Sequence, residues 1–240
     1  MENSSPLIHL SGICYSYPGA LPVLKDLNLT IYAGQRIGLV APNGSGKTTL
    51  FHVIMGLLKP DKGKIEIFGK EMVQEKNFSE IRQQIGLLFQ DSDDQLFCPT
   101  VKEDVAFGPL NQGYSKDEAI EITQNTLKTL GLNEYEDRIT FKLSGGEKRL
   151  VSLATVLAMQ PKILLLDEPT TGLDRKTKGR LTEVIQSLSI TLVVISHEFD
   201  FLSAVAKEVY TLEEGKIETE RKVFLHSHEH EHAVDKHPHH

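Results

Sequence analysis

A glycine-rich loop between an apolar run and an amphipathic segment constrains this chain more than any other feature. Residues 37–40 are apolar and suit a buried strand, and residues 48–58 carry apolar side chains at helical spacing. Between them, Gly44 and Gly46 allow backbone amides to turn toward an anion at the positive end of the following helix dipole. A strand, a glycine-rich loop and a helix in this order predict a phosphate-binding loop.

The same loop supplies side chains for a nucleotide. Lys47 can reach the β- and γ-phosphates, and the Thr48 hydroxyl can bind magnesium. Ala41 stands where the motif has its first glycine, and its methyl group is tolerated if φ stays negative. A glycine-rich turn before an ordinary helix is the alternative interpretation. We expect the nucleotide to contact Ala41, Pro42, Asn43, Gly44, Ser45, Gly46, Lys47, Thr48 and Thr49.

An acidic strand end is the second feature that favours nucleotide chemistry. Residues 163–166 are apolar and are followed by Asp167 and Glu168. Adjacent residues of a strand point to opposite sides, so we expect one carboxylate in the magnesium shell and the other directed elsewhere. We assign Asp167 to magnesium and Glu168 to positioning the attacking water as a base. A solvated acidic strand end is the simpler alternative.

Residues 143–150 read Leu-Ser-Gly-Gly-Glu-Lys-Arg-Leu and carry a further anion-binding pattern. Ser144 and Glu147 fit the capping box that starts many helices, so a well-capped helix explains part of the pattern. A cap does not need the two glycines that follow the serine. Gly145 and Gly146 leave the helix N-terminus bare, and its amides and the Ser144 hydroxyl can then approach a phosphate.

In this order, the motifs resemble those of the ABC transporter ATPases over residues 7 to about 220. The resemblance implies that Gln90 is the Q-loop glutamine and a magnesium ligand, and that His197 is the switch histidine. It assigns Tyr17 to stacking on adenine and Asp174 to the D-loop. Taken singly, Tyr17 would be a packing residue and His197 a structural one. The implied catalytic residues are Glu168, His197 and Gln90, and Ser144, Gly145, Gly146 and Asp174 join the nucleotide contacts.

The predicted fold is α/β, with an N-terminal antiparallel β lobe, a central and mostly parallel sheet, and a helical signature subdomain. Strands over 7–17 and 23–32 are expected to form the lobe, and residues 209–219 a closing hairpin. We place the ATPase domain at 1–225, with its helical subdomain at about 91–160. Further strands are expected over 64–68, 85–89, 163–166 and 191–195, helices over 117–130, 144–159 and 175–188, and an irregular loop over 91–100.

Within the family, residues 87–109 resemble the energy-coupling-factor subgroup, whose ATPases drive uptake of vitamins or of cobalt and nickel. This resemblance implies ATP and Mg²⁺ as cofactors and a second ATPase subunit, expected to be identical. It also implies a transmembrane coupling subunit, a small membrane protein that binds the substrate, and a position on the cytoplasmic face of the cell membrane. The chain departs from the family at Ala41 and at Glu147, where glutamine is usual, and we expect modest effects on nucleotide affinity.

Composition and charge limit the classes of function that fit this chain. The net charge of −7 and the pI near 5.8 disfavour a nucleic-acid-coating surface. Cys14 and Cys98 lack CxxC spacing, which favours reduced thiols, and the N-terminus shows no export signal. The apolar runs are shorter than the roughly 20 residues of a spanning helix. A soluble ABC ATPase acting on nucleic acid or the ribosome is a weaker hypothesis, because such proteins usually carry two cassettes or an inserted arm.

The last fifteen residues, 226–240, hold seven of the ten histidines and are expected to form a disordered tail. Neutral imidazoles bind nickel, cobalt, copper and zinc, and alternating His and Glu suit several coordination geometries. A purification tag or an inert polar end is the alternative, and a metal-storing protein would leave the ATPase motifs unexplained. The predicted transition-metal ligands are His226, His228, His230, His232, His237, His239 and His240.

Overall fold

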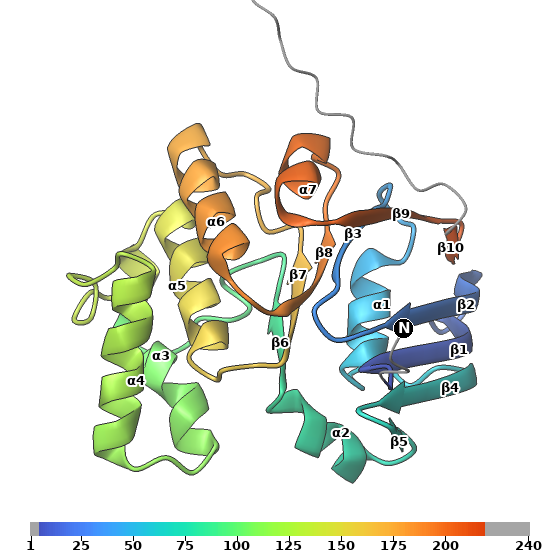
Figure 1. Cartoon of the computed structure of the whole chain (residues 1–240), viewed down its shortest axis with the longest axis horizontal. Helices are drawn as coiled ribbons and strands as arrows, with labels where there is room; N and C mark the ends of the chain where they lie inside the picture. The colour runs from blue at the N-terminus through green and yellow to red at the C-terminus, as the bar shows by residue number, and fades with distance from the viewer. Residues whose placement is uncertain (1–4, 219–240) are drawn as a thin grey trace, which may run out of the picture.

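The computed structural model describes residues 5–218, and the histidine-rich stretch lies outside the described residues. An antiparallel sheet forms one side of the molecule (Figure 1). Its strands follow the spatial order β2-β1-β4-β5, so residues from beyond the glycine-rich loop complete the predicted N-terminal lobe. The strands are β1 (Ile8–Ser16), β2 (Pro22–Ile31), β4 (Lys62–Ile67) and β5 (Lys70–Glu71).

A second, six-stranded sheet forms the centre, in the order β10-β9-β3-β8-β7-β6. All neighbours in it run parallel except the β9 and β10 hairpin. The carboxyl ends of β3, β7 and β8 therefore lie at one edge, where α/β proteins bind ligands. The strands are β3 (Arg36–Val40), β6 (Ile85–Leu88), β7 (Ile163–Asp167), β8 (Thr191–Ile195), β9 (Glu208–Glu213) and β10 (Lys216–Glu218).

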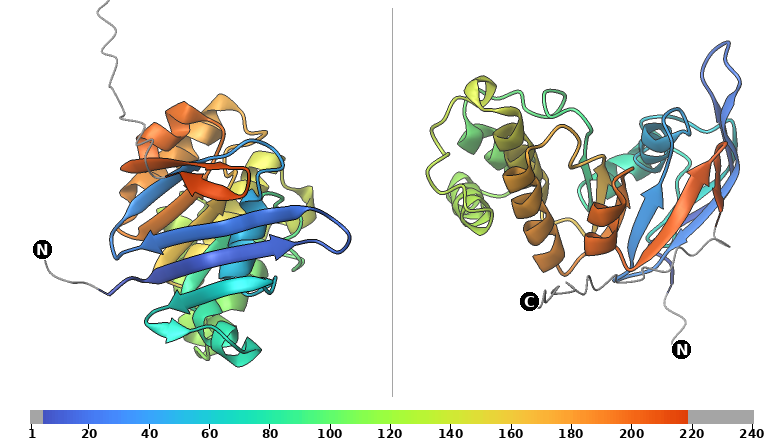
Figure 2. Two further views of the ribbon diagram at one scale, coloured as in Figure 1. Left: turned by 90° about the vertical axis from the view of Figure 1, so that its right-hand side faces the viewer. Right: turned by 90° about the horizontal axis from the view of Figure 1, so that it is seen from above.

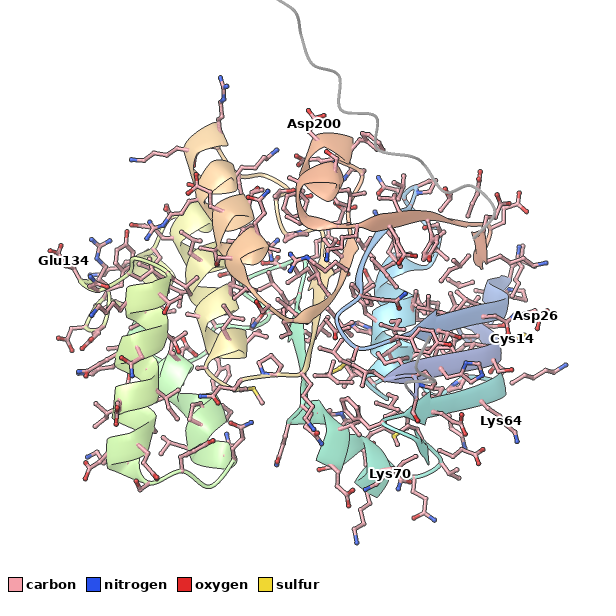
Figure 3. All side chains as sticks on the ribbon, in the orientation of Figure 1. Cys14, Asp26, Lys64, Lys70, Glu134 and Asp200 are labelled. Atoms are coloured by element: carbon pink, nitrogen blue, oxygen red, sulfur yellow. The ribbon has the colours of Figure 1, made fainter. Side chains whose placement is uncertain are left out.

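Helices cover both faces of the central sheet. Helix α1 lies between the two sheets, and α3 to α6 gather on the opposite side (Figures 1 and 2). Figure 3 marks these two ends, with Asp26 and Lys64 on the antiparallel side and Glu134 on the helical side. The helices are α1 (Lys47–Ile54), α2 (Glu75–Arg82), α3 (Val101–Asn111), α4 (Lys116–Thr129), α5 (Gly145–Leu157), α6 (Arg175–Ser187), α7 (Phe199–Val205) and the 3₁₀ turn η1 (Thr140–Lys142).

Two apolar cores follow from this layering. One lies between the sheets around α1 and includes the fully buried Phe51 and Ile54. The other fills the space between the central sheet and the helices beyond it, and includes Leu150 and Leu164. The α/β architecture with an antiparallel lobe and a helical subdomain is confirmed. None of the helices within residues 5–218 has the length and apolarity that crossing a membrane requires.

Three helices were not predicted. Helix α3 begins with a capping box formed by Thr100 and Glu103, a signal that is present in the sequence, but Gly108 and Pro109 near its end hide the helical pattern. Helices α2 and α7 have only 8 and 7 residues, too short for apolar periodicity to distinguish them from loops. The region between β6 and α3 contains no helix or strand, as expected for 91–100.

Candidate nucleotide-binding site

The glycine-rich loop leaves β3 and enters α1 through two left-handed glycines. Gly44 has φ +80° and Gly46 has φ +96°, a region that side chains disfavour. Ala41 is buried and is not among the non-glycine residues with positive φ, so its methyl group causes no strain. The loop thus keeps the required backbone shape without the motif's first glycine.

Two side chains of the loop contact the end of β7. Lys47 Nζ lies 2.7 Å from Glu168 Oε1 and 3.3 Å from Asn43 Oδ1. The Thr48 hydroxyl donates a hydrogen bond of 2.7 Å to Asp167 Oδ2. Residues that are about 120 positions apart in the chain are thereby brought to one point at the edge of the central sheet.

Asp167 has the properties of a magnesium ligand. Its side chain is buried, which raises the pKa of the carboxyl, and the Thr48 hydrogen bond opposes that rise only in part. Its Oδ1 atom is buried and has no hydrogen-bond partner among the described residues. A buried oxygen without a partner is unfavourable unless something else binds it. A divalent cation held by Asp167 and the Thr48 hydroxyl would satisfy this atom, and these oxygen ligands suit Mg²⁺.

Glu168 contacts Lys47 and His197, whereas Asp167 contacts Thr48, so the two adjacent carboxylates have different partners. Strand β7 ends at Asp167, and Glu168 has φ +46°, so the alternation stops before it. The left-handed residue brings the second carboxylate to the same loop as the first. Burial raises the pKa of Glu168, but the hydrogen bond and charge of Lys47, together with His197, outweigh it, and the pKa is lowered overall.

His197 lies just beyond β8 and contacts the same carboxylate. Its Nδ1 atom is 2.8 Å from Glu168 Oε2, while its side chain remains 61% exposed. The Thr171 hydroxyl also donates to Glu168 Oε2, at 3.3 Å. Glu168 is therefore held between a cation and an imidazole, an arrangement that fixes the position of its carboxylate.

Gln90 lies across an open cavity from the glycine-rich loop. The cavity has a volume of about 750 Å³, and Thr48, Gln90 and Gly145 are among the residues that line it. Tyr17 lies at another side of the loop, where its hydroxyl is 3.1 Å from Thr49 Oγ1 and its ring is 41% exposed. The exposed ring face leaves room for stacking on a base.

Arg149 is a residue of this region that the sequence did not single out. Its side chain is buried, and its guanidinium donates to the backbone carbonyls of Phe89, Gln90 and Glu168. Burial lowers the pKa of this arginine. No local sequence pattern distinguishes it, because Glu147 and Lys148 directly before it are charged as well.

The signature segment 143–150 starts α5 as a capping box. Ser144 is the N-cap, and Glu147 accepts hydrogen bonds from the Ser144 amide and hydroxyl. Gly146 is explained by packing, since a Cβ there would lie 2.9 Å from Thr177. Packing does not explain Gly145, because a Cβ there would meet no atom of residues 5–218 within 4 Å. Asp174 caps α6 through the amides of Lys176 and Thr177, which accounts for its side chain without a nucleotide.

Transition-metal ligands are a separate question. Within the described residues 5–218, no three His, Cys, Asp or Glu side chains are grouped to hold a metal ion. The seven predicted histidine ligands, from His226 to His240, lie outside that range.

Comparison with known proteins places these motifs in a family context. The ABC transporter family model matches residues 24–171. A protein of Nitratidesulfovibrio vulgaris, named only provisionally as an ABC transporter ATP-binding protein, is 47% identical over 94% of this chain and 84% of its own length. The energy-coupling factor transporter ATP-binding protein EcfA of Methanothermobacter thermautotrophicus is 43% identical over 88% of this chain and 69% of its own.

Solved structures agree with the sequence relatives. The protein cbiO1 of Clostridium perfringens, part of the ABC transporter complex cbiONQ, has a TM-score of 0.79 and 33% identity over 90% of this chain and 88% of its own. An ATP-binding cassette solved as a dimer in a post-hydrolysis state with ADP and phosphate has a TM-score of 0.80 and 27% identity, covering 88% of this chain and 96% of its own.

Proposed function

This chain belongs to the ABC transporter family as an ATP-binding subunit that hydrolyses ATP to drive transport, and we propose that it powers an energy-coupling-factor importer. Two relatives at 43% and 40% identity carry the EcfA name, and cbiO1 is part of the ABC transporter complex cbiONQ. We assign the ATPase domain to residues 1–225, with a helical subdomain at about 91–160, and treat 226–240 as a separate tail.

The convergence of Lys47, Thr48, Asp167 and Glu168 carries the proposed chemistry. Lys47 and the loop amides bind the β- and γ-phosphates, and Tyr17 stacks on adenine. Glu168 orients the attacking water, and His197 holds that carboxylate in place. Asp167, Thr48 and Gln90 hold Mg²⁺, which neutralises phosphate charge when bound.

A head-to-tail homodimer would complete the site. Family members work as dimers with transmembrane components, and in our proposal Ser144 and Gly145 of one subunit contact the nucleotide on the glycine-rich loop of the other. Gly145 supports this view because, within residues 5–218, no atom lies close enough to require a glycine there. A bare helix N-terminus suits a phosphate that approaches from outside the chain.

An aromatic surface next to the cavity is our candidate for the contact with the membrane coupling subunit. We define this aromatic surface by Phe97, Phe107 and Phe141, which are 66%, 47% and 72% exposed. The Phe97 and Phe107 rings pack edge to face, with centroids 4.8 Å apart. The amides of Phe97 and Cys98 donate to buried Asp104, so the exposed ring stands on a fixed backbone. Exposed aromatic groups on a rigid support are typical of protein interfaces.

The substrate assignment rests on the tail. Seven histidines within residues 226–240 favour nickel or cobalt over a vitamin such as biotin, which stays the alternative substrate class. We propose that the tail gathers or senses the metal at the cytoplasmic face of the membrane, where the ATPase binds peripherally to its partners. A soluble ABC ATPase without a transport role is the weaker alternative.

Co-expression tests this assignment. The chain is expected to co-purify with a multi-span membrane protein and a small membrane substrate-binding protein, and cells with all three should accumulate nickel or cobalt in an ATP-dependent way. Vitamin uptake without metal uptake would instead support the alternative assignment, a vitamin importer. Absence of any membrane partner would contradict the importer assignment.

A further inference from the structure

Glu147 places a negative charge beside the helix N-terminus that the proposed function gives to nucleotide phosphates. Its Oε2 atom accepts hydrogen bonds from the Ser144 amide at 2.8 Å and from the Ser144 hydroxyl at 2.9 Å. The family usually has a neutral glutamine at this position. A carboxylate here repels an approaching phosphate, so its charge needs a counterpart.

Two residues from the loop after α4 supply that counterpart. The Tyr135 hydroxyl donates to Glu147 Oε1 at 2.8 Å, and Arg138 Nη1 donates to the same oxygen at 2.9 Å. The Arg138 guanidinium lies over the Tyr135 ring, 3.8 Å from its centroid. Figure 3 labels Glu134, the neighbour of Tyr135, at the outer end of the helical side. Each carboxylate oxygen of Glu147 thus has two donors.

The charge of Glu147 persists at any physiological pH. The Ser144 amide, the Tyr135 hydroxyl and Arg138 lower the pKa of this carboxyl to about 2, against the opposing effect of burial. Within residues 5–218, Arg138 is the only cation at ion-pair distance from it. Nearby Arg180 donates instead to the carbonyls of Leu130 and Gly131.

We propose that Arg138, stacked on Tyr135, is a positioning residue that neutralises Glu147 and thereby allows the anionic nucleotide of a second subunit to dock at Ser144 and Gly145. The inference rests on the composite site of the proposed function. It explains how the chain can carry a glutamate beside a helix N-terminus that is proposed to receive a phosphate. Arg138 acts through Glu147 and needs no contact with the nucleotide.

A double-mutant cycle tests the proposal on the full-length chain. ATPase activity is measured against ATP concentration for wild type, Arg138→Gln, Glu147→Gln and the double variant. We expect Arg138→Gln to raise the KM for ATP about three- to fivefold, the size expected for a partly exposed ion pair, with little change in kcat. In the Glu147→Gln background the same change should alter KM by less than about 1.5-fold, because no charge is left to neutralise.

Three controls sharpen the test. Arg138→Lys keeps the charge and should stay close to wild type, and it remains informative if Arg138→Gln folds poorly. Tyr135→Phe removes a hydrogen bond but no charge, so its KM should rise less than that of Arg138→Gln. In about 0.5 M salt, Arg138→Gln should raise the KM for ATP less, because dissolved ions screen the repulsion between Glu147 and the nucleotide phosphates.

Several results would overturn the proposal. Equal KM changes from Arg138→Gln in both backgrounds would mean that Arg138 acts independently of Glu147, and an unchanged KM would mean that its charge is irrelevant. Failure of the composite site itself would be recognised by a different measurement, because Ser144→Ala would then leave ATP-induced dimerisation intact. That result would remove the proposed dimer site and this inference together.

Discussion

The ammonium group of Lys47 and the carboxylate of Glu168 are joined 2.7 Å apart, with the glutamate almost fully buried and the lysine 11% exposed. The residue proposed to bind phosphate is thus paired with the residue proposed to activate water. A nucleotide phosphate that engages Lys47 competes with Glu168 and would release the carboxylate for its catalytic role. Substrate binding and activation of the base are then one event.

Glu168→Gln should therefore separate binding from chemistry. The neutral amide competes less for Lys47, so Mg²⁺-dependent ATP affinity should be kept or increased and the dimer trapped, while turnover falls about 100-fold or more. Lys47→Ala is the contrasting variant and should lose affinity. Equilibrium binding of a fluorescent ATP analogue and phosphate release give the two readouts. Wild-type turnover in Glu168→Gln would show that the base is another residue.

Mixing two inactive subunits tests the composite site. Lys47→Ala and Ser144→Ala homodimers each lack half of every site, but a mixed dimer has one site with both halves intact. Mixtures should regain up to about one quarter of wild-type ATPase activity, because half of the dimers are mixed and each has one of two sites. Mixtures that stay as inactive as the separate variants would contradict the head-to-tail arrangement.

The aromatic surface should be needed for the membrane partner but not for ATPase activity. The residues just before Phe97 are less suited to this contact, because Leu96 packs partly against the helical core and Gln95 donates inward to Ser152 and Thr155. Phe97→Ala with Phe141→Ala is therefore the sharper variant. Detergent-free ATPase activity should persist while co-purification with the coupling subunit is lost.

Val73→Ala is the matched control for that experiment. Val73 is 68% exposed, comparable to Phe97, and it lies between β5 and α2, away from the aromatic surface. It should leave the complex intact. Undiminished complex formation by the double phenylalanine variant would show that the interface lies elsewhere on the protein.

Acid should weaken the contribution of Glu147 to stability. Its folded-state pKa, about 2, is below the ordinary value of 4.5, so the ionised carboxylate stabilises the fold at pH values above 4.5. That contribution is lost as pH falls from 4.5 toward 2, because the unfolded chain takes up the proton first. Wild type should exceed Glu147→Gln by up to about 1 kcal/mol at pH 7. Urea unfolding at pH 7, 5 and 3 should show the gap closing only at the lowest pH, and a gap constant with pH would contradict the assignment.

The histidine-rich stretch should bind metal independently of ATP hydrolysis. Calorimetry with nickel and cobalt is expected to show more than one ion bound to the full chain, with affinity falling as pH drops through about 6.5. Deleting residues 226–240 should abolish this binding and change metal accumulation in cells, while basal ATPase activity stays near normal. Identical titrations for full-length and truncated protein would refute the metal assignment.

The elements that form the proposed nucleotide-binding edge could be predicted from the sequence, because each of them carries a local pattern. A strand, two glycines and a helix define the loop around Lys47, and an apolar run ending in Asp167 defines β7. The orientation of Glu168 could not be derived from alternation alone, because alternation applies within a strand, and Glu168 is a left-handed residue just past the end of β7. No sequence pattern predicts a left-handed backbone conformation at a glutamate.

Other features depend on the tertiary structure and have no local signature. Arg149 contacts carbonyls that are up to 60 residues away, and a lone arginine on a helix gives no indication of such partners. The pairing of Glu147 with Arg138 is similar, since the two meet only because the loop after α4 folds back on α5.

The loop that carries Arg138 is also tied to the base of the aromatic surface. The amide of Val101 donates to the Arg138 carbonyl at 3.1 Å, and Thr100 forms an isolated bridge with Ile139. Thr100 lies three residues from Phe97, and Arg138 reaches Glu147 on the other side. A displacement of Phe97 by a membrane protein would therefore reach the signature helix through the backbone hydrogen bonds that join residues 99–102 to residues 136–140. Signalling between transporter and ATPase would then pass along one short path of neighbouring residues.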